Sequence, residues 1–70
     1  MIVIALGVYH DGDPKEYRAA RTMDAAHAWL HGQGFRPRQA RHDELSYYEH
    51  DIAMRWARVY AVADIEEDAE

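Results

Sequence analysis

The first nine residues, Met1 to Tyr9, are the longest apolar run in the chain, and they restrict its fold more than any other segment. The run is rich in β-branched residues and alternates as a strand does, so that one face carries Ile2, Ile4, Leu6 and Val8. The other face is also largely apolar, which is typical of a central strand covered on at least part of both faces. The run is far too short to span a bilayer and lacks the basic start of a signal peptide. We therefore expect a strand from Met1 to His10.

A turn and a second strand are expected next. The sequence Asp11-Gly12-Asp13-Pro14 is strong turn chemistry, because glycine supplies a positive φ and proline presets its own φ. Lys15 to Arg21 then returns as the second strand.

Thr22 to Gln33 has the clearest helical pattern of the chain. Thr22 is a good N-cap, and the apolar stripe consists of Met23, Ala26, Trp29 and Leu30. Gly34 suits the left-handed position that ends a helix, and Phe35 would then pack back on Leu30 in a Schellman motif.

Two alternatives remain open after Pro37, because residues 38–70 contain no Gly, Pro or Asn. One is a helix over residues 43–64, whose stripe would be Leu45, Tyr48, Ile52, Trp56, Val59 and Ala63. The other is a hairpin of two strands, Gln39 to Tyr48 and Met54 to Ala63, which the aromatic and β-branched content favours. Ala5 and Gly7 in the first strand would leave room for large neighbours such as Trp56 and Tyr60. We therefore predict an α+β fold of order ββαββ, with ββαα as the alternative.

The chain is predicted to be one domain, residues 1–70, with an acidic C-terminal tail from about residue 64. It has no cysteine, so neither a disulfide nor a thiolate ligand is available. Ser46 is the only serine, and it lies in no recognisable catalytic motif. Asp24, His27 and His31 share one side of the helix and resemble a metal-ligand set, but the spacing is common and we interpret them as a solvated face. We expect no enzymatic activity, no cofactor and no metal.

The charge is concentrated in the last 28 residues, which hold nine carboxylates and only two arginines. A negative surface repels nucleic acid and membrane phosphate and attracts basic partners. The carboxylates predicted to bind such a partner are Asp43, Glu44, Glu49, Asp51, Asp64, Glu66, Glu67 and Asp68. The arginines just before this segment, Arg36, Arg38 and Arg41, are expected to pair locally with it.

The aromatic residues are the second set of predicted contact residues. If one helix covers only one face of the sheet, the other face is left to aromatic side chains, which are typical interface hot spots. The predicted anchors are Tyr47, Tyr48, Trp56 and Tyr60.

In its small size, lack of cysteine, acidic segment and compact α+β layout around the helix TMDAAHAWLHGQGF, the chain resembles the small acidic anti-CRISPR proteins that phages encode. The resemblance implies a non-enzymatic inhibitor in the cytoplasm of a bacterial host. Such an inhibitor binds the basic surface of a CRISPR effector complex and blocks DNA binding, without contacting nucleic acid or membrane itself. The arginine cluster departs from a uniform DNA mimic. The alternative is a homodimeric regulatory or antitoxin-like protein whose aromatic sheet face is the interface.

Overall fold

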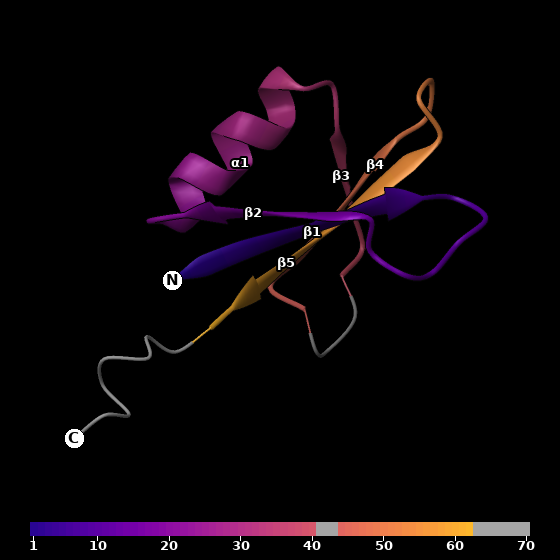
Figure 1. Ribbon diagram of the computed structural model, residues 1–70. Helices are drawn as coiled ribbons and strands as arrows, with labels where there is room; N and C mark the ends of the chain where they lie inside the picture. The colour runs from indigo at the N-terminus through magenta and orange to yellow at the C-terminus, as the bar shows by residue number, and fades with distance from the viewer. Residues whose placement is uncertain (41–43, 63–70) are drawn as a thin grey trace.

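The computed structural model describes residues 1–40 and 44–62, and this part of the chain forms a five-stranded antiparallel sheet with one helix against one face (Figure 1). The elements are β1 (Ile2–Val8), β2 (Glu16–Ala20), α1 (Met23–Gly32), β3 (Arg36–Arg38), β4 (Ser46–His50) and β5 (Arg55–Ala61). In the sheet the strands lie in the order β2-β1-β5-β4-β3. The predicted α+β class is confirmed, but the order along the chain is ββαβββ, with one strand more than expected.

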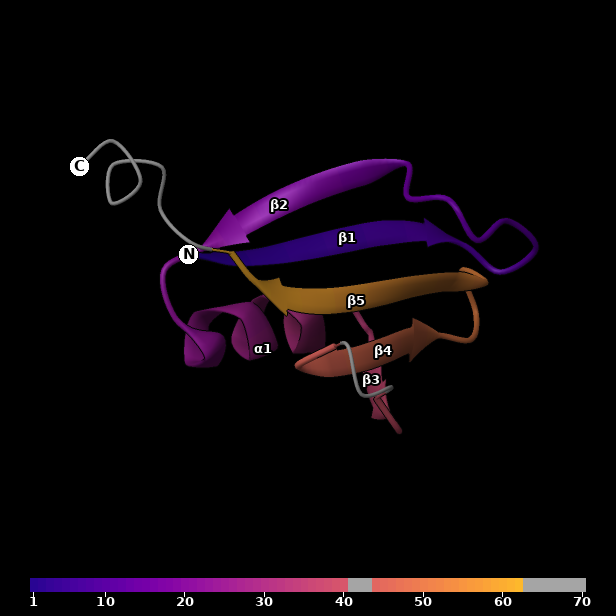
Figure 2. The same ribbon diagram turned by 90° about the horizontal axis from the view of Figure 1, so that it is seen from below.

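The apolar strand β1 lies at the centre of the sheet, as its composition predicts. It pairs with β2 on one side and with β5 on the other, and Figure 2 shows it between these two strands. Ile4, Ala5 and Leu6 are almost completely buried, so side chains shield this part of β1 on both faces, although α1 covers only one of them.

The segment after Pro37 forms strands, and the alternative of a helix over residues 43–64 is wrong for the residues described there. The expected hairpin is present as β4 and β5, although β4 starts later and ends later than predicted, at His50. The additional strand β3 pairs with β4 and contains Pro37. A proline is compatible with a short edge strand, because the outward side of such a strand needs no N–H donor.

Both ends of α1 have the predicted caps. The Thr22 Oγ1 accepts a hydrogen bond from the Ala25 N–H at 3.1 Å. At the other end Gly34 has a φ of 95°, and the Phe35 N–H donates to the Leu30 carbonyl at 3.0 Å, which completes a Schellman motif. These caps fix where the chain leaves the helix to begin β3.

The hydrophobic core lies between α1 and the sheet face that it covers. Ala26 and Leu30 of the helix, together with Phe35, pack against side chains of three strands, namely Ile4, Leu6, Tyr48, Ala57 and Val59. Since residues alternate between the faces of a strand, the residues between these core positions belong to the opposite face.

Candidate binding surface on the open face of the sheet

The sheet face opposite α1 carries most of the aromatic side chains. Residues directly opposite each other in an antiparallel pair share a face, and in the observed register Gly7 lies opposite Trp56 and Tyr47 lies opposite Arg58. The register places on this face Val3, Ala5, Gly7, Tyr17, Ala19, Arg36, Arg38, Tyr47, Glu49, Trp56, Arg58 and Tyr60. No element of residues 1–40 and 44–62 covers it as α1 covers the other face (Figure 1). We call it the open face.

Trp56 forms the floor of the open face because Gly7 leaves space for its ring. A Cβ added at Gly7 would lie 2.2 Å from Cζ2 of Trp56, so only glycine permits this contact. The indole N–H donates to the Asp11 carbonyl at 2.9 Å, and the Arg58 guanidinium lies 4.3 Å from the ring centroid. Trp56 is consequently only 3% exposed and supports Arg58 from below.

Arg58 is held in the middle of the open face by two further neighbours. Its Nε lies 3.3 Å from Oε1 of Glu44, whose side chain is only 3% exposed. Tyr47 lies opposite it on β4. Because its neighbours fix the guanidinium before any partner arrives, little side-chain entropy remains to be lost on binding.

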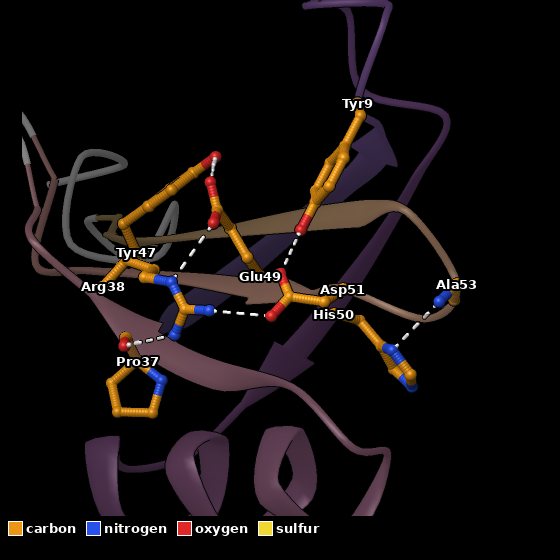
Figure 3. A network of polar contacts seen from close by, with 8 residues as sticks. All are labelled: Tyr9, Pro37, Arg38, Tyr47, Glu49, His50, Asp51 and Ala53. Atoms are coloured by element: carbon orange, nitrogen blue, oxygen red, sulfur yellow. Dashed lines mark hydrogen bonds and ion pairs between the residues drawn. The ribbon is translucent and has the colours of Figure 1, made fainter.

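A network around Arg38 lies at the β3 end of the open face, where Arg38 is opposite Tyr47 of β4 (Figure 3). The Arg38 guanidinium contacts Glu49 Oε1 at 3.3 Å and Asp51 Oδ2 at 3.0 Å. Asp51 also accepts a hydrogen bond from the Tyr9 hydroxyl at 2.8 Å, and Glu49 accepts one from the Tyr47 hydroxyl at 3.0 Å. The expected local pairing of the arginine cluster with the acidic segment is therefore confirmed for Arg38.

The hydroxyl groups in this network are held in their neutral form. Desolvation, followed by the hydrogen bond to Asp51 and the nearby negative charges, raises the pKa of Tyr9 to about 12. Burial and the Glu49 carboxylate raise the pKa of Tyr47 as well. Both tyrosines act as hydrogen-bond donors at neutral pH, not as bases.

The predicted carboxylates fall into two groups. Glu44, Glu49 and Asp51 all lie against arginines of the same chain. The others, Asp43, Asp64, Glu66, Glu67 and Asp68, lie outside the described residues. Residues 1–40 and 44–62 contain seven acidic and seven basic side chains, so the whole formal charge of −5 belongs to the remaining residues.

The predicted aromatic anchors are also divided by the structure. Tyr47 and Tyr60 lie half-buried on the open face, whereas Trp56 lies beneath Arg58. Tyr48 lies on the other face, in the core, and is 2% exposed. Tyr17, which is not among the four predicted anchors, is 65% exposed at the β2 end of the open face. The alternation of residues along β5 places Arg58 on the same face as Trp56 and Tyr60, and this pattern is the sequence signal for Arg58 as a residue of the binding surface.

The two histidines of α1, His27 and His31, lie against Tyr48. His27 Nδ1 is hydrogen-bonded to the Tyr48 hydroxyl, and the His31 ring meets the Tyr48 ring edge-on at 5.8 Å between centroids. His27 is half-buried, so the interpretation of this side of the helix as simply solvated is wrong at His27. Within the described ranges no group of three His, Cys, Asp or Glu side chains is arranged to hold a metal ion.

The described part of the chain has no helix long and apolar enough to cross a membrane. No protein family, curated protein or solved structure matches the sequence or the fold. The functional argument therefore depends on the geometry of the open face itself.

Proposed function

We propose that this chain is a non-enzymatic interaction protein that binds a basic protein partner through the open face of its sheet. The observation that carries the proposal is the uncovered pair of Tyr47 and Tyr60 above the Trp56 floor, beside an Arg58 whose charge is offset by Glu44 at 3.3 Å. Tyrosine and arginine on a preorganised support are the side chains that dominate binding energy in protein interfaces.

The charge of the chain supports a basic partner. The described body is formally neutral, and the surplus of carboxylates belongs to the sequence that follows Val62. In this proposal the open face provides the specific contacts, while the carboxylates after Val62 increase the rate of encounter. Glu44, Glu49 and Asp51 are given a supporting role, because all three already form ion pairs within the chain: Glu44 with Arg58, and Glu49 and Asp51 with Arg38.

In its narrower form, the proposal is that the partner is the Lys/Arg-lined DNA site of a nucleic-acid-binding complex, such as a CRISPR effector. The resemblance in size and charge supports this choice. The test is displacement of labelled target DNA from a purified effector complex, followed by fluorescence anisotropy. We expect the chain to displace the DNA, and Tyr47→Ser/Tyr60→Ser to lose this ability. The matched control is Ala28→Ser on the exposed side of α1.

An aromatic sheet face also suits stacking with single-stranded nucleic acid. A second binding experiment distinguishes this function from the proposed one. We expect no binding of a labelled single-stranded oligonucleotide, because a chain of net charge −5 repels phosphate. Tight oligonucleotide binding that Tyr47→Ser/Tyr60→Ser removes would replace the proposed function with nucleic-acid binding. Failure to displace DNA from any effector would leave the narrower form without support.

A further inference from the structure

The two edges of the sheet are built differently. Met1 and Val62 exchange backbone hydrogen bonds, so the backbone groups of Met1 face β5. Because these groups alternate in direction along a strand, this pair fixes which residues of each strand face a neighbouring strand and which face away from it. On β3, Arg36 and Arg38 are the residues that face β4, and Pro37 faces outward. Proline has no N–H to offer, and the Pro37 carbonyl accepts a hydrogen bond from the Arg38 guanidinium at 3.2 Å. The β3 edge is therefore closed to a further strand.

The β2 edge has no such protection. Here Glu16, Arg18 and Ala20 face β1, so the backbone groups of Tyr17 and Ala19 point away from the sheet. The strand itself contains no proline or lysine, and four of its five residues are exposed. Its regular alternation begins at Glu16, because the Lys15 N–H still donates to the Leu6 carbonyl at 2.6 Å. Figure 2 shows β2 as the outermost strand on its side of the sheet. An unprotected edge of this kind is a template for pairing with another strand.

The side chains of β2 are complementary to themselves. An antiparallel pair of two β2 strands centred on Tyr17 places Glu16 opposite Arg18 of the second copy, and the two-fold axis repeats this pair. Centring one residue later places Arg18 opposite Arg18 of the second copy, which is a repulsive arrangement. Centring on Ala19 pairs no opposite charges. The charges thus select one register out of three.

We propose that β2 pairs with β2 of a second copy of this chain, antiparallel and centred on Tyr17, to form one continuous ten-stranded sheet across a dimer. The occupant is a second copy because the Glu16 and Arg18 charges are satisfied by the same strand reversed. Glu16 then lies between Arg18 of the second copy and its own Arg55, 2.9 Å away.

The surface beside the β2 edge fits this arrangement. A shallow groove on the helix side is lined by Ile4, Ala20, Ala25 and Trp29, and Arg18 lies over the Trp29 ring at 5.4 Å from its centroid. In the Tyr17-centred register Ala20 lies opposite Pro14 of the second copy. The proline ring then lies beside the Ala20 end of this groove, which is apolar. The dimer also brings the two Tyr17 side chains together on the open face, which extends that face across both copies.

The test is the molar mass of the full chain measured by sedimentation equilibrium over a range of micromolar concentrations. We expect a monomer–dimer equilibrium for the wild type. Ala19→Pro should be monomeric, since the Ala19 N–H points outward and its loss removes no bond to β1. Circular dichroism checks that each variant is folded. A wild type that stays monomeric throughout the range overturns the proposal.

A charge exchange tests the register. Glu16→Arg alone should weaken dimerisation about tenfold, because it replaces two attractive cross-strand pairs with two repulsive ones. Glu16→Arg/Arg18→Glu should restore the dimer, although it also loses the contact with Arg55. No rescue by the double variant contradicts this register. The experiment is independent of the proposed function, since Tyr47→Ser/Tyr60→Ser should leave the dimer intact.

Discussion

At the scale of single residues, Gly7 decides whether Trp56 can lie on the sheet. Gly7→Ala places a Cβ inside the volume of the indole ring, 2.4 Å from Cε2, so Trp56 and the Arg58 above it must move. We expect a loss of about 2 kcal/mol in the free energy of unfolding, which is typical of overpacking. Urea denaturation followed by Trp fluorescence measures it. Gly12→Ala is the matched control, because nothing lies near its added Cβ. Equal effects of the two substitutions would contradict the packing described for Trp56.

The phenol of Tyr9 gives a second prediction, on pH dependence. Its folded pKa of about 12 exceeds the ordinary value of 10.0, so the unfolded chain releases this proton first. The free energy of unfolding should therefore fall as the pH rises from about 10 to about 12. The difference in phenolate absorbance between the wild type and Tyr9→Phe reports this group alone.

Asp51→Asn tests how much Asp51 contributes, beside desolvation, to the raised pKa of Tyr9. It removes the negative charge beside the Tyr9 hydroxyl and should lower the pKa of Tyr9 toward its ordinary value. Asp13→Asn, on the exposed β1–β2 connection, should leave it unchanged. An unaltered Tyr9 titration in Asp51→Asn would show that Asp51 does not contribute to it.

At the scale of elements, the turn between β4 and β5 stores strain at Met54. Met54 has a φ of 56°, in the left-handed region that disfavours residues with a Cβ. Met54→Gly should therefore raise the free energy of unfolding by about 1 kcal/mol. Ala53→Gly is the matched control and should lower it, since Ala53 has no positive φ and glycine only adds flexibility. Thermal denaturation of both variants measures these changes, and destabilisation by Met54→Gly would contradict the strain assigned to Met54.

The elements differ in how far their sequence determines them. The caps Thr22 and Gly34 act locally, so the helix was predicted with both of its ends. Met54 adopts the conformation of a glycine without being one, so the hairpin after Pro37 had no turn signal and competed with a helix. The exposed strand β3 forms only because β4 offers it a partner, which no local pattern indicates.

The same distinction applies to the candidate site. The space that Gly7 leaves for Trp56 was predicted, because small and large residues alternate on neighbouring strands. The position of Tyr48 in the core was not predicted, because it depends on the register that brings β4 under His27. Pairing of Glu44 with Arg58 likewise requires the fold, since the two residues belong to different segments.

At the scale of the whole molecule, residues 1–40 and 44–62 are formally neutral and the other residues carry the net charge of −5. We expect the first group to provide the specific contacts with a partner and the second to speed the encounter. The dissociation constant of the complex with an effector, measured at low and high salt, separates these roles. Tyr47→Ser/Tyr60→Ser should weaken binding about 100-fold at both salt concentrations, since two interface anchors are removed. Glu66→Gln/Glu67→Gln/Asp68→Asn should weaken it only a few-fold at low salt, because salt screens exposed charges. If instead the three neutral substitutions abolish binding while the two serines leave it intact, the open face is not the contact surface.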